Sequence, residues 1–135
     1  MKALLDTHVF LWWVMDNERL IPFIRDFISN EKNELFLSSA SCWEIAIKTN
    51  LRRLKLSDKP DKFIPDQMNA NNISGLPIQL VHALHVYNLP DHHRDPFDRM
   101  LVAQAIIEKI PIITNDLIIA KYDIKTLWDK KKRRS

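Results

Sequence analysis

The chain has 135 residues, a length typical of one domain, with 46% hydrophobic residues, 27% charged residues and a net charge of +3. A single cysteine, Cys42, excludes an intramolecular disulfide and any zinc site built from several cysteines, and no apolar run reaches the roughly 20 residues that span a bilayer. The only glycine, Gly75, excludes both glycine-rich phosphate-binding loops, so phosphate groups would have to be bound by metal ions or basic side chains. Because no signal peptide is evident either, a cytoplasmic protein that does not contact membranes is expected.

The first half of the chain alternates short apolar runs with helical patterns. Apolar runs without polar alternation are typical of strands buried on both faces of a parallel sheet. Pro22 suits a first helical position, whereas Pro65 is unfavourable inside the helix in which it falls. The predicted elements are a strand at 3–5, helices at 9–15 and 22–28, a strand at 35–37, a helix from about residue 41 and a helix over 57–72.

The second half continues the alternation. Asp95 and Pro96 are a strong helix start, with Asp at the N-cap and Pro at the first helical position. The predicted elements are a strand at 76–78, helices at 81–87 and 96–109, a strand at 110–114, a short helix at 116–122 and a strand at 124–128. Strands that alternate with helices pair in parallel through right-handed crossovers. The sequence therefore predicts an α/β domain over residues 1–128, with three α/β/α layers and a central, mostly parallel sheet.

Residues 129–135 form a basic tail, which either is solvated or contacts a polyanion.

Four carboxylates are expected at one edge of this sheet. Asp6 follows the first strand and Asp116 follows the fourth, while Glu44 and Asp98 are expected in the first turns of two helices. In parallel α/β folds, ligands bind beyond the carboxyl ends of the strands, where these positions converge.

Each acid also has a purely structural interpretation. Ser41 and Glu44 match a capping box, and Asp98 in a first turn is favoured by the helix dipole. Asp116 suits an N-cap and Asp6 an ordinary turn. Taken together, however, four like charges at a partly buried edge are costly unless a cation compensates them. Mg²⁺ or Mn²⁺, which bind carboxylate oxygens and keep several waters, would do so.

Other phosphate and metal chemistries fit less well. A hydrolase of the haloacid dehalogenase type needs a second Asp two positions after the first, where this chain has His8, and a phosphorelay receiver needs an acidic pair after its first strand. A zinc site of histidines is disfavoured because the side chains of His92 and His93 would diverge, while His82 and His85 fall on an apolar helix.

Four ordered motifs resemble those of PIN-domain proteins, and in particular the VapC-like toxins of type II toxin–antitoxin systems. The motifs are Leu4-Leu5-Asp6-Thr7-His8, Ser41-x-Trp43-Glu44-Ile45-Ala46-Ile47-Lys48, His93-Arg94-Asp95-Pro96-Phe97-Asp98-Arg99 and Thr114-Asn115-Asp116. The resemblance runs from about residue 2 to residue 128 and does not include the basic tail.

The resemblance implies a ribonuclease that depends on Mg²⁺, with Mn²⁺ as a substitute, and that is usually a homodimer held inactive by a cognate antitoxin. Asp6, Glu44, Asp98 and Asp116 match the acidic positions of the family. Asp6 and Asp98 are the first choices for metal ligands, and Asp116 would complete the shell or act through water. Glu44 would orient or deprotonate the attacking water.

Several neighbouring residues are predicted to bind the substrate. The hydroxyls of Thr7 and Thr114 would hold the carboxylates or a phosphate oxygen, although Thr114 also suits a plain strand end. Lys48 would either pair with Glu44 or contact phosphate, while Arg94 and Arg99 match phosphate bidentately. The two histidines of the preceding loop, at 92 and 93, would either stack on an unpaired base or remain solvated.

The tryptophans at 12, 13 and 43 are expected in the core. An exposed stripe would instead mark a dimer or antitoxin surface, for which the helices over 22–28 and 43–53 are plausible borders.

Three functions remain open: a toxin endoribonuclease, an RNA-processing nuclease without a toxin role, and an inactive PIN-like module that binds RNA or protein. The last would be marked by loss of one of the acids, and all four are present.

Overall fold

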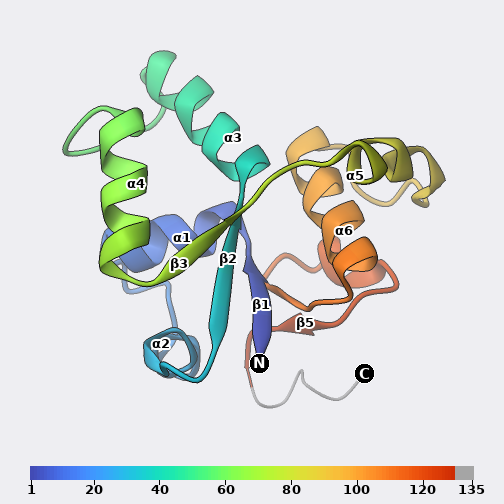
Figure 1. Ribbon diagram of the computed structural model, residues 1–135, viewed down its shortest axis with the longest axis horizontal. Helices are drawn as coiled ribbons and strands as arrows, with labels where there is room; N and C mark the ends of the chain where they lie inside the picture. Colours follow the sequence, from blue (N-terminus) through green and yellow to red (C-terminus); the bar gives the residue numbers. More distant parts are fainter. Residues whose placement is uncertain (130–135) are drawn as a thin grey trace.

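The computed structural model describes residues 1–129; most of the basic tail lies outside the described residues. Within that range the chain forms one sheet of five strands in the order β3-β2-β1-β4-β5, and all four strand pairs are parallel (Figure 1). The strands are β1 (Lys2–Leu5), β2 (Glu34–Ser38), β3 (Ile73–Leu76), β4 (Ile112–Ile113) and β5 (Thr126–Leu127). The predicted parallel α/β/α architecture is therefore confirmed.

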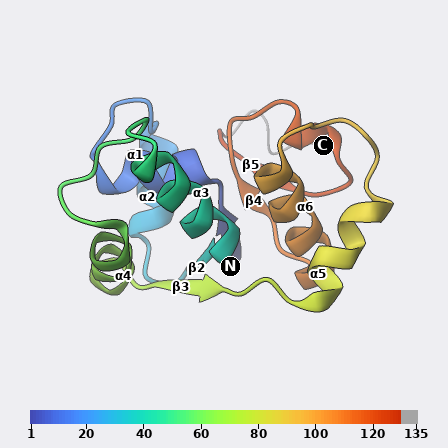
Figure 2. The ribbon, with the colours of Figure 1, turned by 90° about the horizontal axis from the view of Figure 1, so that it is seen from above.

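Helices cover both faces of the sheet. They are α1 (Thr7–Val14), α2 (Pro22–Ser29), α3 (Ser39–Asn50), α4 (Pro60–Ala70), α5 (Leu80–His85) and α6 (Pro96–Glu108), with 3₁₀ turns at Val86–Asn88 and Ile119–Lys121. Seen from above, α1, α2 and α4 gather on one side and α5 and α6 on the other (Figure 2). Helix α3 stands between the two groups and contacts both α4 and α6. No helix among residues 1–129 is long and apolar enough to cross a membrane.

The strands divide their side chains between two cores, because successive residues of a strand point to opposite faces. On β1, Ala3 and Leu5 join the core beneath α1, α2 and α4, whereas Leu4 joins the core beneath α6. Strand β4 is divided in the same way, with Ile113 in the first core and Ile112 in the second. This two-sided burial explains why the strands lack polar alternation.

Several predicted elements differ from those observed. Strand β3 begins at Ile73 rather than at residue 76, and it ends before Pro77, which has no N–H to donate. Its central residues are exposed because β3 lies at the edge of the sheet, so the apolar signal of a buried strand is missing. Helix α4 begins at Pro60 and includes Pro65, which is exposed, so the carbonyl left without a helical donor can be hydrated. The helix expected over 116–122 is only a 3₁₀ turn, at Ile119–Lys121.

Candidate active site

The ends of β1 and β4 bring two of the predicted acids together. The strands are neighbours, and the N–H of Asp6 donates to the carbonyl of Ile113. Asp6 is the buried N-cap of α1, and its carboxylate accepts the Thr114 hydroxyl at 2.6 Å. The same hydroxyl accepts the N–H of Asp116 at 3.0 Å. Thr114 thus links the two acids, so its predicted contact with a carboxylate is present.

The start of α6 brings in the third acid. Asp95 is the N-cap and accepts the N–H groups of Phe97 and Asp98, which fixes Asp98 in the first turn as predicted. The Nε2 atom of His93 lies 3.0 Å from Asp116 Oδ2 and 3.2 Å from Asp98 Oδ2. A continuous chain of contacts therefore runs from Asp6 through Thr114, Asp116 and His93 to Asp98.

The backbone determines which proton His93 carries. Its Nδ1 accepts the N–H of Asp95 at 3.1 Å, so in the neutral ring the proton is on Nε2. Nε2 then donates to the Asp116 carboxylate, with Asp98 Oδ2 3.2 Å away, and has no lone pair for a metal. Although these three side chains lie close enough to hold an ion together, the geometry makes His93 a donor that positions the carboxylates rather than a ligand.

The carboxylates differ sharply in their electrostatic surroundings. Burial raises the pKa of Asp98 to about 7, and the negative charges of Asp6, Asp95 and Glu44 act in the same direction, against an opposing effect of His93. For Asp6, burial also favours the neutral form, but hydrogen bonds from His8 and Thr114 outweigh it and lower the pKa. Asp6 is thus a stable anion, whereas Asp98 ionises at a cost unless a cation is present.

The fourth acid comes from α3. Glu44 is buried and its carboxylate lies 2.6 Å from the Lys48 ammonium, so the predicted pairing of these residues is present. The capping-box interpretation was wrong, because α3 begins earlier than expected: Ser38 is the N-cap and Glu44 falls in the second turn. Ser41 instead accepts the Thr7 hydroxyl at 2.7 Å, a buried bond that ties α1 to α3.

The donor set fits a hard divalent cation. Carboxylate oxygens are the ligands that Mg²⁺ prefers, and Mn²⁺ accepts the same ligands. Asp98 and Asp116 belong to the group of side chains close enough to hold one ion, and Asp6 is linked to Asp116 through Thr114. The pKa of Asp98 is raised first by burial and then by the negative charges around it, and a bound cation would offset both effects.

The predicted substrate-binding residues are placed in different ways. Thr7 is committed to Ser41, as described above. The guanidinium of Arg99 donates to the carbonyls of residues 86, 90 and 93 and to the hydroxyl of Tyr122, so it holds the loop before α6. Arg94 is exposed, in the same loop. Of the three basic residues predicted to contact phosphate, Arg94 is the exposed one, and its role stays a prediction.

Two residues at the site carry more than the sequence suggested. His93 was expected only to stack on a base or to be solvated. Its position two residues before the N-cap of a helix was the sequence feature that could have indicated its contact with the acids. The pKa of His8 is raised chiefly by its hydrogen bond to Asp6, against the effect of burial. Its side chain is largely exposed above Asp6, at the mouth of the site.

The tryptophans are less buried than expected. Trp12 and Trp13 are half-buried and pack against the core of α1, α2 and α4, whereas Trp43 is 61% exposed. The prediction that Trp43 is a core residue was therefore wrong. Being half a turn from the buried Ile45, it points to the other side of α3.

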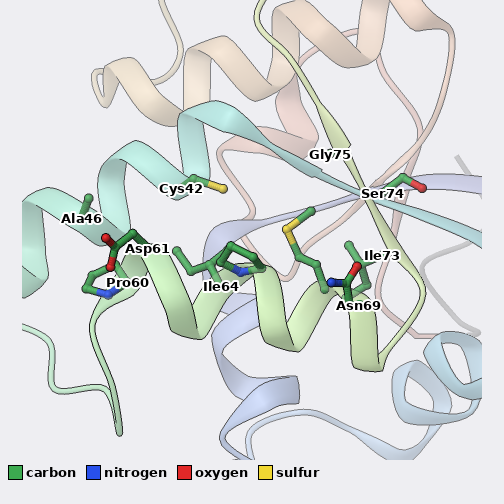
Figure 3. A pocket seen from close by; sticks show the side chains of 11 residues that line it. Cys42, Ala46, Pro60, Asp61, Ile64, Asn69, Ile73, Ser74 and Gly75 are labelled. Carbon is green, nitrogen blue, oxygen red and sulfur yellow. The ribbon is translucent and has the colours of Figure 1, made fainter.

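A separate depression of about 660 Å³ lies between α3, α4 and the edge strand β3 (Figure 3). Cys42 on α3 and Ile64 on α4 line facing sides of it, and none of the four acids contributes. Helix α3 borders it as expected, but α4 and β3 form the rest of the wall, and none of the residues 22–28 lines it. Burial raises the pKa of the Cys42 thiol, so this depression is suited to apolar contact rather than to thiol chemistry.

Known proteins resemble the chain in sequence and in fold. A sequence model of the PIN domain family matches residues 3–125. A stretch of 61 residues, 45% of the chain, is 33% identical to Ribonuclease VapC16 of Mycobacterium tuberculosis (strain ATCC 25618 / H37Rv), and it spans 43% of that relative's length.

Two solved structures share the fold over nearly the whole chain. One is VapBC2 from Rickettsia felis bound to a DNA fragment from their promoter, with a TM-score of 0.71 at 12% identity, covering 96% of this chain and all of that one. The other is DNA-bound VapBC from Salmonella typhimurium, with a TM-score of 0.69 at 17% identity, covering 96% of this chain and 99% of that one. At these identities the likeness speaks for the fold alone.

Proposed function

The chain belongs to the PIN domain family, and from that premise we propose that it is a metal-dependent endoribonuclease acting as the toxin of a toxin–antitoxin pair. The observation that carries the proposal is the chain of contacts from Asp6 through Thr114, Asp116 and His93 to Asp98. It joins acids from three separate segments at the carboxyl edge of the sheet. If each acid had only a structural role, there would be no reason for the acids to lie together.

The metal would be held by Asp6 and Asp98, with Asp116 completing the shell or acting through water. A bound Mg²⁺ or Mn²⁺ supplies neutralisation of the scissile phosphate and a water of lowered pKa. Thr114 keeps Asp6 and Asp116 in place, and His93 donates to Asp116 while its ring lies 3.2 Å from Asp98, between the two carboxylates.

Glu44 would orient or deprotonate the attacking water. The Lys48 ammonium contacts one oxygen of the Glu44 carboxylate, Oε2, at 2.6 Å. His8 at the mouth of the site, with its raised pKa, adds a donor beside Asp6 for an incoming phosphate oxygen.

The partners proposed are an RNA substrate, a cognate antitoxin and a second copy of the chain, in the cytoplasm. The apolar depression between α3, α4 and β3 is a suitable antitoxin surface, because β3 pairs only with β2 among residues 1–129 and so offers a free edge. The second copy is assigned to the outer face of α5 and the 3₁₀ turn after it, where Leu80, Leu84 and Tyr87 are exposed. An antitoxin partner agrees with the similarity to VapBC complexes.

Cleavage of a mixed RNA pool tests the activity. Wild-type protein, freed of any antitoxin, is expected to cut RNA with Mg²⁺ or Mn²⁺ and to stop in EDTA. Asp98→Asn is expected to lose about 1,000-fold in rate, equivalent to about 4 kcal/mol of lost transition-state stabilisation. Asp26→Asn, at an exposed position on α2, is the matched control and should cut normally.

Two results would change the conclusion. Folded wild-type protein that cuts no RNA with either metal would favour the binding module instead. Cutting without any growth arrest when the protein is expressed alone in cells would favour an RNA-processing nuclease over a toxin.

A further inference from the structure

A second pocket lies on the opposite side of α3 from the depression described above, and none of the four acids lines it. It has a volume of about 410 Å³ and is lined by residues of α3, α5, the start of α6 and the loop before it. The side chains that give it its character are Trp43, Phe97 and Arg94, with Ala40, Ile78 and Val86 completing the apolar wall. This size and lining are typical of a site for a small, mostly apolar group with a few polar contacts.

The chain connects this pocket directly to the catalytic acids. Trp43 precedes Glu44 and Phe97 precedes Asp98, so each aromatic residue is the immediate neighbour of an acid. The two rings meet edge to face, with centroids 5.3 Å apart and planes at 79°. Phe97 therefore supports the indole from one side while most of the Trp43 side chain stays exposed.

Arg94 gives the pocket a positive charge that no neighbour neutralises. Among residues 1–129 its guanidinium has no hydrogen-bond or ion-pair partner, although the adjacent acids make this edge strongly negative. The two other predicted cations are committed, Arg99 to loop carbonyls and Lys48 to Glu44. Arg94 is thus the cation here that is left for a ligand.

We propose that this pocket binds an unpaired nucleobase of the RNA strand being cut, with the base stacked on Trp43 and Arg94 contacting its edge or the adjoining phosphate. The proposal rests on the proposed ribonuclease function and specifies where the nucleotide next to the scissile phosphate is held. Proteins recognise single-stranded RNA by stacking splayed bases on aromatic side chains and on arginine planes. An exposed indole, a free guanidinium and adjacent phosphate chemistry supply those elements together.

A second copy of the chain is the rival occupant. The apolar residues assigned above to the dimer, Leu80, Leu84 and Tyr87, do not line this pocket, to which α5 contributes Ala83 and the 3₁₀ turn after it contributes Val86. A dimer formed through the outer face of α5 therefore does not need the pocket, and the charge of Arg94 suits a phosphate better than an apolar partner surface.

Binding of fluorescently labelled hexamers of A, C and U RNA tests the proposal. Anisotropy is measured in EDTA, so that the strands are not cut, with wild type, Trp43→Leu, Trp43→Phe and Arg94→Met. Arg53→Met, which removes an exposed arginine at the far end of α3, is the control for charge. We expect Trp43→Leu to weaken binding by about 5- to 140-fold, the range for losing one stacked base, and Trp43→Phe to retain most of the affinity.

Arg94→Met is expected to weaken binding and to reduce its salt dependence, while Arg53→Met leaves both nearly unchanged. Unchanged RNA affinity in Trp43→Leu would overturn the proposal. So would a change of oligomeric mass in Trp43→Leu by light scattering without a loss of RNA affinity, since a second copy would then occupy the pocket.

The same data, together with RNA cleavage assays, test the base-binding pocket and the ribonuclease activity separately. Wild type that binds RNA through Trp43 but does not cut it with Mg²⁺ would refute the nuclease and keep the pocket. Wild type that cuts RNA, together with a Trp43→Leu variant of unaltered KM, would keep the nuclease and refute the pocket.

Discussion

Replacing Asp98 by Asn is expected to stabilise the metal-free protein above pH 7, although it removes a proposed metal ligand. Burial, reinforced by nearby negative charges, raises the pKa of Asp98 from 3.8 to about 7 in the folded protein. Between these values the unfolded chain releases the Asp98 proton and the folded chain keeps it. The free energy of unfolding therefore falls as the pH rises from about 4 to 7, and the destabilising contribution of Asp98 stays constant above that range.

The size of the effect follows from the shift. At about 1.36 kcal/mol per pKa unit, ionising Asp98 in the folded protein costs about 4 kcal/mol above pH 7. Relaxation and water reduce this value, so a gain of about 2–4 kcal/mol in the free energy of unfolding is expected for Asp98→Asn at pH 8. At pH 4 the gain should vanish, because wild-type Asp98 is then protonated and resembles the amide.

Asp6→Asn is the matched control with the opposite sign. Hydrogen bonds lower the pKa of Asp6 in the folded protein, so its charge stabilises the fold above pH 4 and the contribution is lost as the pH falls through the folded pKa. Asn is as good an N-cap as Asp, so the cap of α1 is kept. Asp6→Asn should therefore destabilise the protein at pH 8, where Asp98→Asn stabilises it.

Urea unfolding followed by circular dichroism, at pH 4 and pH 8 in EDTA, measures both variants. Adding Mg²⁺ at 100 times its Kd should stabilise wild type by about 2.7 kcal/mol and leave Asp98→Asn nearly unchanged, which narrows the difference between them. If Asp98→Asn were neutral or destabilising at pH 8 in EDTA, the carboxylates would not be crowded, and the case for a compensating cation would fail.

Two further predictions concern the loop before α6. His93→Ala should weaken Mg²⁺ and Mn²⁺ binding alike, by about 10- to 100-fold in calorimetric titrations, and His93→Gln should restore part of the affinity because its amide still donates. A loss confined to Mn²⁺ would mean instead that the imidazole nitrogen is a ligand. Arg99→Met should lower the free energy of unfolding by about 2–4 kcal/mol, measured in urea, because it leaves loop carbonyls without their donor. A change below 0.5 kcal/mol, the usual size for surface substitutions, would show that solvent replaces these bonds.

The sequence was sufficient for the fold because the strands are buried on both faces. Runs such as Ala3-Leu4-Leu5 have no polar alternation, as expected of strands covered on both faces. In a chain where strands alternate with helices, a parallel sheet between two layers of helices is the simplest arrangement that buries such strands. The position of the edge strand β3 was not predicted, because Ser74 and Gly75 are exposed and the apolar triplet that follows contains Pro77. Edge strands lack the burial from which a sequence pattern is recognised.

The site was predictable as positions but not as contacts. Residues that follow parallel strands must lie at one edge, which is why Asp6 and Asp116 were found to meet. The role of His93 depends on a backbone N–H at residue 95 that determines its tautomer, and that of Arg99 on carbonyls from three separate positions. Such contacts arise only when the loop has folded, so composition and spacing do not encode them visibly.

The unequal surroundings of Asp6 and Asp98 suggest how one edge can be both stable and reactive. Asp6 is surrounded by donors, from His8 and Thr114, and so remains a fixed anion whether or not a cation is near. Asp98 is partly buried and has three negative neighbours, opposed only by the nearby His93, so most of its charge is left to be compensated by a ligand. A cation bound between them gains little from neutralising the first and much from neutralising the second. Binding of the cation should therefore release the Asp98 proton below pH 7. Neutralising the unfavourable charge of Asp98 would add to the metal affinity, and a cluster in which every carboxylate already had enough donors would not provide this gain.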